Sequence, residues 1–157
     1  MAPATDFDTL RKSAEIAQRI PEMLVDPAHM VEEATKQILN SHSREYAKAL
    51  QTGDPEYLSE TNGFNWDKGI WEMAVNSTAG ILAACKTVLS PDTNAPKIAG
   101  SLSSGLHHAS TGSGSGYCTV NGLAVAANSF KNLNIMILDL DAHCGGGTVN
   151  MLRDLGI

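Results

Sequence analysis

The sequence has few aromatic residues, few cysteines and no long apolar or basic run. Because aromatics make up only 5% of the 157 residues, a core must be built mainly from Ala, Leu, Ile, Val and Met. The three cysteines include no Cys-x-x-Cys pair, which argues against a disulfide framework and against a thiolate zinc site. This cysteine usage favours a reducing, cytoplasmic setting.

Charge and hydrophobic patterning argue against two classes of partner. The net charge is −6 and Arg11-Lys12 is the only basic pair, so the chain shows no nucleic-acid footprint. No apolar run approaches the length of a membrane span, and residues 1–8 lack the pattern of a signal peptide. We therefore expect a soluble globular protein with no direct nucleic-acid partner and no membrane partner.

Helical spacing of apolar residues dominates residues 1–96. Residues 58–70 interrupt it and are expected to form an irregular surface loop that carries Phe64 and Trp66. The predicted helices are 8–20 with Asp8 as N-cap, a segment from Asp26-Pro27 through Ile38, a stretch around Tyr46 to Leu50, and 71–89.

Residues 97–157 alternate between strand and helix signals. A short strand is predicted at 97–102, a helix at 120–130, a stronger strand at 134–141, and a last helix from Val149. The unbroken apolar run inside 134–141 is typical of a parallel strand that is covered on both faces. This order predicts an α/β fold, and because two strands alone are marginal, we expect one part of a larger domain.

Three polar side chains alternate at the end of the stronger predicted strand. Asp139, Asp141 and His143 should share one face, at the carboxyl end where α/β proteins place their sites. Burying such charges without compensation is costly, and a bound cation is the simplest compensation. A solvated strand end is the alternative interpretation.

Adjacent histidines follow the first predicted strand. His107 and His108 are two of the five histidines in the chain, and beside a metal cluster they are a candidate acid–base dyad. His29 and His42 are interpreted as ordinary helical residues. The glycines at 112–116 and 145–147 suggest phosphate binding as a rival hypothesis, but they lack dinucleotide and P-loop spacing.

Three motifs, in this order, make the chain similar to the histone deacetylase and acetylpolyamine amidohydrolase superfamily. A looser likeness continues upstream through residues 62–67. The three motifs are Gly100-Ser-Leu-Ser-Ser-Gly-Leu-His107-His108-Ala109, Gly116-Tyr117-Cys118-Thr119-Val120-Asn121 and Asp139-Leu-Asp141-Ala-His143-Cys-Gly.

The resemblance implies an arginase–deacetylase fold, in which a many-stranded parallel sheet lies between helical layers. This chain would supply the helix-rich N-terminal portion of one such domain, with residues 1–96 mainly helical and 97–157 forming strand, helix and strand. It would end after the strand that holds the zinc ligands.

The resemblance also implies roles for single residues. Asp141 and His143 correspond to two of three zinc ligands, and His107 and His108 to the tandem catalytic histidines. Asp139 matches the carboxylate that orients the first histidine and that also belongs to a potassium site. Gly116 and Tyr117 match the floor and the aromatic wall of the acyl-lysine channel.

The implied reaction is zinc-dependent hydrolysis of an acetylated primary amine, either acetyl-lysine or an acetylated polyamine. The family's third zinc ligand and its oxyanion-stabilising tyrosine or histidine have no counterpart in the 157 residues. Gly146 stands where many members carry an aspartate that pairs with the second histidine. Gly145 stands where arginases carry a further metal-binding carboxylate, which favours a mononuclear deacetylase site.

Two functional hypotheses follow. In the first, the chain is the N-terminal portion of a zinc deacetylase whose active site is completed by a missing C-terminal half. In the second, it is a catalytically inactive, deacetylase-like chain that serves as a binding module or forms homo-oligomers through exposed sheet edges.

Overall fold

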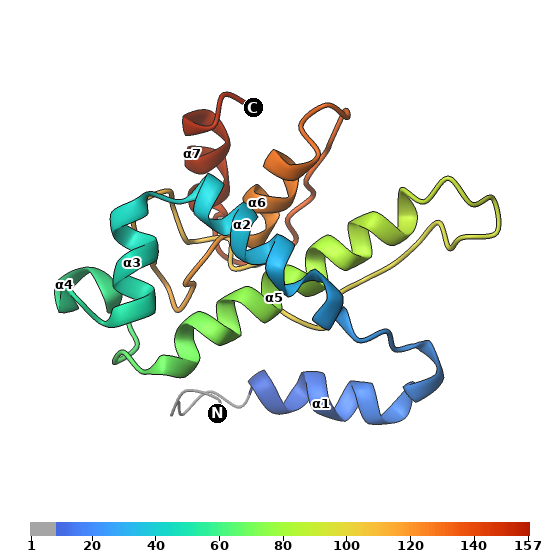
Figure 1. The fold of residues 1–157 in the computed structure, drawn as a ribbon, viewed down its shortest axis with the longest axis horizontal. Helices are drawn as coiled ribbons and strands as arrows, with labels where there is room; N and C mark the ends of the chain where they lie inside the picture. Colours follow the sequence, from blue (N-terminus) through green and yellow to red (C-terminus); the bar gives the residue numbers. More distant parts are fainter. Residues whose placement is uncertain (1–8) are drawn as a thin grey trace.

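The computed structural model describes residues 9–157, in which helices predominate (Figure 1). The predicted N-cap Asp8 lies outside the described residues. The predicted helices are present with small differences in their ends, and residues 56–59 add a short helix at the edge of the expected loop. The elements are α1 (Thr9–Arg19), η1 (Pro21–Met23), η2 (Pro27–Met30), α2 (Val31–Ser41), α3 (Arg44–Thr52), α4 (Glu56–Ser59), α5 (Lys68–Val88), α6 (Gly122–Ser129) and α7 (Gly146–Asp154).

Local capping explains where several of these elements begin and end. Asp26 accepts a hydrogen bond from the backbone N–H of Ala28 at the start of η2, as its sequence position before a proline predicts. Asp67 caps α5 in the same way. Gly53 ends α3 in the left-handed conformation with φ of 80°, where a side chain would also collide with the ring of Trp66.

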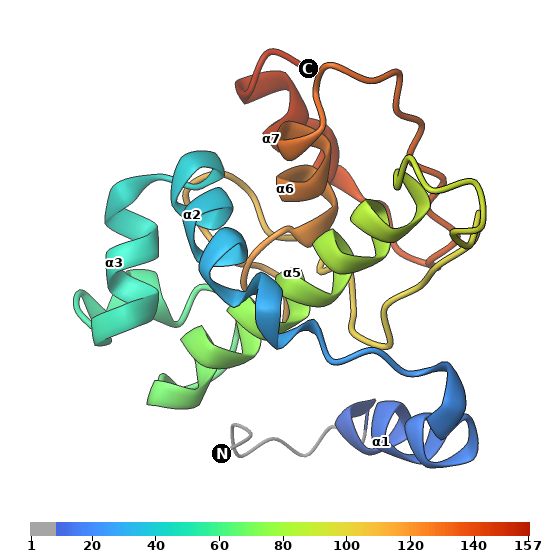
Figure 2. The same ribbon diagram turned by 45° about the vertical axis from the view of Figure 1, so that its right-hand side comes forward.

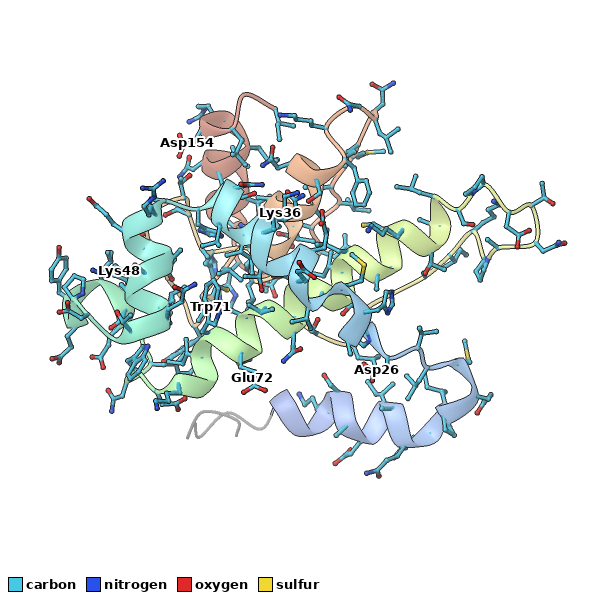
Figure 3. All side chains as sticks on the ribbon, viewed as in Figure 1. Asp26, Lys36, Lys48, Trp71, Glu72 and Asp154 are labelled. Carbon is cyan, nitrogen blue, oxygen red and sulfur yellow. The ribbon has the colours of Figure 1, made fainter. Side chains whose placement is uncertain are left out.

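The core forms where α2, α3 and α6 pack against the long helix α5. Its members are mostly aliphatic or small, as the scarcity of aromatics predicts, and small residues allow the helices to approach closely. Charged side chains such as Lys36, Lys48 and Glu72 are exposed (Figure 3). Fully buried core residues include Ala34, Ile38, Tyr46, Leu50, Ile70, Ala74, Ala79, Leu82, Val120, Ala124, Val125 and Met151.

Helices α6 and α7 stand together at one side of α5, whereas α1 lies at the opposite side (Figures 1 and 2). Met151 of α7 is fully buried and joins α7 to the core. None of the described helices combines the length and the apolarity that crossing a membrane requires.

The expected parallel sheet is not confirmed. Within residues 9–157 the structure contains no β-strand beyond an isolated bridge between Ser115 and Cys118, and both predicted strands, 97–102 and 134–141, lie outside regular secondary structure. The physical reason is that a strand needs backbone partners and cover for its side chains, and the described residues offer neither. Met136, Leu138 and Leu140 are 89%, 77% and 85% exposed, so the apolar run meets solvent where two covering layers were expected.

Candidate active site

Three segments of the chain meet beside the start of α7. They are the turn at 107–108, the glycine-rich loop at 112–118 and the irregular segment 139–145. The backbone N–H of Thr148 in α7 donates to the carbonyl of His107 at 3.0 Å. A side chain at Gly147 would overlap the backbone of His108, so the helix and the histidine turn are in direct contact.

His107 is held by a carboxylate from the 139–145 segment. Its Nδ1 lies 2.6 Å from Oδ2 of Asp139, and only 12% of the imidazole side chain is exposed. This hydrogen bond is the main reason that the pKa of Asp139 lies below its ordinary value. A Cβ at Gly145 would lie 2.5 Å from the same carboxylate oxygen, so a side chain there would force the Asp139 carboxylate to shift.

Asp141 and His143 form a second close pair. Oδ1 of Asp141 lies 3.0 Å from Nδ1 of His143 and 3.7 Å from Nε2 of His107. The backbone N–H of His143 donates to the same oxygen at 2.8 Å, and this bond is the main cause of the lowered pKa of Asp141. The pair therefore joins an ionised carboxylate to an imidazole nitrogen.

The spacing of this pair fits two ligands of one zinc ion. Donors that each lie about 2.0–2.2 Å from a zinc ion are themselves separated by about 3.0–3.5 Å when the angle between them is near tetrahedral or somewhat smaller. The two donors are insufficient alone. Among the described residues, no group of three or more His, Cys, Asp or Glu side chains has the geometry to hold a metal ion.

The burial that was expected at this cluster is absent. The side chain of Asp141 is 52% exposed and that of His143 is 75% exposed, because the segment that carries them has no strand partner in the described residues. Because both side chains reach solvent, burial of uncompensated charge does not require a cation at this site. The donor geometry of Asp141 and His143 remains as the observation that fits a metal.

His108 stands between the two pairs. Its ring centroid lies 4.2 Å from that of His107 and 5.8 Å from that of His143. Gly116, with φ of 51°, lies against the ring, and a Cβ there would be 2.6 Å from Cδ2 of His108. Space is open at Gly146, where a Cβ would meet no atom within 4 Å.

An aromatic pair borders the cluster on the side of the glycine-rich loop. Tyr117 adopts a left-handed conformation with φ of 64° and is 49% exposed. Its ring lies 5.3 Å from that of Phe64, which comes from the loop between α4 and α5. The sequence pattern predicts a surface loop around Phe64, but no feature of it indicates that Phe64 lies beside Tyr117.

Two buried residues with no predicted role, His42 and Tyr46, bond to the backbone of residues 119–121 beside the site. His42, at the C-terminal end of α2, is buried, and its Nε2 accepts the backbone N–H of Asn121 at 3.2 Å. Burial lowers its pKa from 6.5 to about 4. The hydroxyl of Tyr46 donates to the carbonyl of Thr119 at 2.7 Å, and burial raises the pKa of this phenol. Helical spacing in the sequence made both residues look like ordinary helix members.

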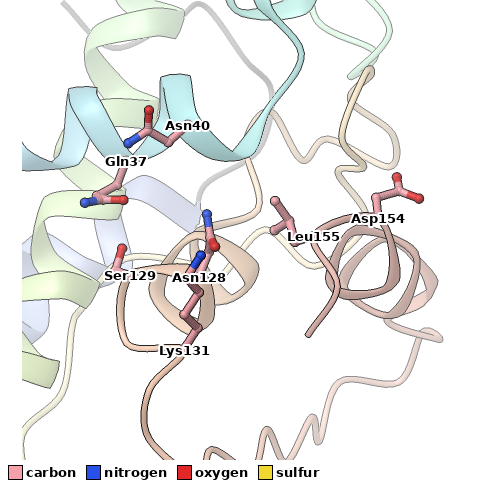
Figure 4. A pocket seen from close by; sticks show the side chains of 7 residues that line it. All are labelled: Gln37, Asn40, Asn128, Ser129, Lys131, Asp154 and Leu155. Atoms are coloured by element: carbon pink, nitrogen blue, oxygen red, sulfur yellow. The ribbon is translucent and has the colours of Figure 1, made fainter.

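A polar hollow of about 550 Å³ lies apart from this cluster, between α2, α6 and α7 (Figure 4). It contains none of the predicted site residues. Apart from Leu155, its walls are amide, hydroxyl and charged side chains, and some of these bond to protein atoms, such as Asn128 to Ser41 and Asp154 to Thr111. The lining residues are Gln37, Asn40, Asn128, Ser129, Lys131, Asp154 and Leu155.

Comparison with known proteins gives a family match over nearly the whole chain. The model of the histone deacetylase domain matches residues 7–155. The acetoin utilization protein AcuC of Staphylococcus aureus (strain MRSA252) is 26% identical over 137 residues, which are 82% of this chain and 34% of that protein. A probable histone deacetylase 1-B of Xenopus laevis is 30% identical over 126 residues, which are 73% of this chain and 26% of that protein.

A third relative is an uncharacterized protein of Picosynechococcus sp. It is 30% identical over 96 residues, which are 59% of this chain and 30% of that protein. The matched part of the chain thus spans about a third of the length of these relatives.

Proposed function

The chain belongs to the histone deacetylase family, and on that premise we propose that it carries part of the active site of a zinc-dependent amidohydrolase that deacetylates primary amines. The observation that carries this proposal is the close placement of two pairs, His107 with Asp139 and Asp141 with His143. One pair has the chemistry to move a proton and the other to bind a metal ion.

Asp141 and His143 are the residues that would hold zinc. Zinc, when bound, supplies Lewis-acid chemistry that polarises a carbonyl group and acidifies water. The remaining ligands would have to come from outside the donor pair described here, since the described residues present no third donor with suitable geometry. A potassium ion near Asp139 is a further part of the proposal, carried over from the family resemblance.

His107 would act as a general base because Asp139 fixes its tautomer. With Asp139 accepting the Nδ1 proton at 2.6 Å, the Nε2 lone pair remains available and faces the Asp141–His143 pair. His108, whose ring lies 4.2 Å from that of His107, would protonate the departing amine. It would do so without a carboxylate partner at position 146, where this chain has glycine.

The substrate would be an acetylated primary amine, with acetyl-lysine and acetylated polyamines as the two classes. Gly116 would form the floor of a narrow acyl channel because its lack of a side chain lets the loop lie against His108. Tyr117 would form an aromatic wall for the alkyl chain of the substrate, and its contact with Phe64 would extend that wall.

A second candidate function rests on the incomplete donor set. A chain with two metal ligands and an exposed apolar run has the features of a binding or oligomerising module that lacks catalysis. The two hypotheses differ in whether hydrolysis depends on Asp141.

Deacetylation of an acetyl-lysine peptide and of an acetylated polyamine, assayed with the natural full-length protein, separates the two functions. We expect hydrolysis of at least one substrate and its loss in Asp141→Ala. The matched control is Asp92→Ala, which removes an exposed aspartate whose side chain, in the described part of the chain, accepts a hydrogen bond from Asn94 of its own loop. Equal activity in Asp141→Ala and the parent protein would contradict the proposed function, and absence of activity in all three would favour the module.

A further inference from the structure

A buried amide lies directly behind the histidine turn. Asn121 is fully buried, and its Nδ2 group lies 3.0 Å from the carbonyl of Ala109 and 3.3 Å from that of His107. The same nitrogen lies 2.9 Å from the hydroxyl oxygen of Thr148, which is also buried. The two amide hydrogens are thus shared among three acceptors, two of which belong to the backbone of the turn.

The carbonyl of His107 is the point where these bonds converge. It accepts the backbone N–H of Thr148 at 3.0 Å in addition to the Asn121 amide. The Thr148 hydroxyl lies within 3.4 Å of the same carbonyl. Asn121 at the start of α6 and Thr148 in the first turn of α7 therefore both bond to the carbonyl group of His107, so two helices restrain the same peptide unit.

The turn needs such restraint. Leu106, directly before His107, has φ of 57°, a left-handed conformation that is costly for a residue with a branched side chain. The cost of this conformation is of the order of one lost hydrogen bond or more, so the turn persists only if its surroundings determine it. The His107 imidazole itself is held on its Nδ1 side by Asp139, whose side chain is 29% exposed, and its Nε2 lies 3.7 Å from the more exposed Asp141.

Asn121 is itself held firmly. Its backbone N–H donates to Nε2 of the buried His42, and its Oδ1 accepts the N–H of Ala124 as the N-cap of α6. These bonds use the backbone and the oxygen, which leaves the Nδ2 group for the histidine turn. The two functions of the side chain can therefore be separated by substitution.

We propose that Asn121 is a positioning residue, which acts with Thr148 to hold the His107–His108 turn so that Nδ1 of His107 stays hydrogen-bonded to Asp139. The catalytic consequence rests on the proposed function, whereas the positioning itself does not. Loss of the Asn121 amide would free the turn, let the imidazole leave Asp139, and populate the second tautomer.

The test measures the His107 ring directly, by nitrogen-resolved NMR of the full chain. The Nδ1–H signal is assigned by its disappearance in His107→Gln. Asn121→Ser keeps a good N-cap oxygen but removes the amide. Thr148→Val removes the hydroxyl, and Thr148→Ser restores it. Asn128→Ser is the matched control, because Asn128 is also on α6 and, within residues 9–157, its side chain bonds to Ser41 and not to the histidine turn.

We expect Asn121→Ser and Thr148→Val to mix the two His107 tautomers and to speed exchange of the Nδ1 proton about tenfold, the effect of losing one buried hydrogen bond. Thr148→Ser and Asn128→Ser should match the parent protein. In an active protein, the first two variants should also lower kcat by about 10²-fold with little change in KM, because a small displacement of a catalytic group has this effect.

An unchanged His107 tautomer and exchange rate in folded Asn121→Ser would overturn the proposal. If Asn121→Ser does not fold, the same two quantities are compared between Thr148→Val and Thr148→Ser. Equal tautomer populations and exchange rates in these two variants would overturn the proposal. Because the NMR signal requires no turnover, failure of the deacetylase assignment would leave this result standing, and the two outcomes remain distinct.

Discussion

Gly145 is the residue on which the Asp139–His107 contact depends most directly. Its neighbour Gly146 has no such constraint, because a Cβ there meets nothing within 4 Å. The two glycines are adjacent, with Gly145 at the N-cap and Gly146 at the first position of α7, so they form a pair for testing whether the contact matters.

We predict that Gly145→Ala displaces the Asp139 carboxylate from His107 and lets the pKa of Asp139 rise toward its ordinary value. Carboxyl carbon NMR titration measures this pKa. As the pKa of Asp139 rises, the deacetylation rate of the same variant should fall. Gly146→Ala should leave both unchanged and raise the free energy of unfolding by up to about 1 kcal/mol, since alanine favours the first turn of α7. An identical Asp139 titration in the two variants would contradict the prediction.

His42 gives the protein a pH dependence of stability. The unfolded chain protonates this residue near pH 6.5, whereas in the folded protein burial lowers its pKa to about 4. The folded state is therefore most stable above about pH 6.5 and loses stability as the pH falls from 6.5 toward 4. The loss reaches about 3 kcal/mol, since one unit of pKa corresponds to about 1.4 kcal/mol.

Urea unfolding between pH 7.5 and pH 4.5 measures this loss. His42→Gln retains an acceptor for the Asn121 N–H and should remove most of the pH dependence in that window. His29→Gln, a change at an exposed histidine, should keep it. A stability that stays constant over this range in the parent protein would show that His42 is not buried in its neutral form.

Among the secondary elements, α7 determines where the histidine turn sits. Gly147 in its first turn leaves no space for a side chain against the carbonyl groups of His108 and Ala109. The obstacle is backbone on both sides, so neither neighbour yields by rotating a side chain.

We predict that Gly147→Ala destabilises the protein by about 1–3 kcal/mol despite the better helix propensity of alanine, as overpacking does in dense cores. Thermal unfolding measures this change against Gly146→Ala, which occupies the same helical turn in open space. Equal melting temperatures for the two variants would mean that α7 does not press on the histidine turn.

The helices could be predicted from the sequence because their apolar spacing is local information. The predicted segment 71–89 corresponds to α5 and the predicted segment 120–130 to α6, with ends that differ by a few residues. The strands at 97–102 and 134–141 were not confirmed, because an apolar run becomes a strand only with a partner beside it, and pairing is not local. The short helix α4 was missed because it occupies only four residues.

The candidate site could be predicted only in part, because some of its contacts are local in the sequence and others are not. The grouping of Asp139, Asp141 and His143 was predicted from alternation along a strand, whereas in the structure hydrogen bonds from the backbone N–H groups of Asp141 and His143 to the preceding carboxylates hold this irregular segment. His107 contacts the same group through Asp139. No pattern in the sequence indicated that His42 and Asn121 meet, since their contact spans 79 residues. Phe64 beside Tyr117 was hidden for the same reason.

At the scale of the whole molecule, the apolar residues at 135–140 form a surface that is exposed to solvent. Met136 is 89% exposed, and Leu138 and Leu140 are nearly as open. Monomeric proteins rarely leave such a contiguous apolar surface uncovered, because it promotes association.

We predict that the 157-residue chain self-associates with rising concentration and that Met136→Lys weakens this association. Met23→Lys is the control, because Met23 is also an exposed methionine, at 72%, but lies outside the run. Analytical ultracentrifugation distinguishes the two variants. A monomeric parent chain at all concentrations, or an equal effect of both substitutions, would show that this surface does not drive association.

The most direct test of a metal site built on Asp141 and His143 is the zinc content of the natural full-length protein, measured after purification without chelators. We expect about one zinc per chain in the parent protein and in Asp92→Ala, and loss of zinc in Asp141→Ala and in His143→Ala. Zinc retained at the parent level in both ligand variants would contradict the assignment of this pair as metal ligands.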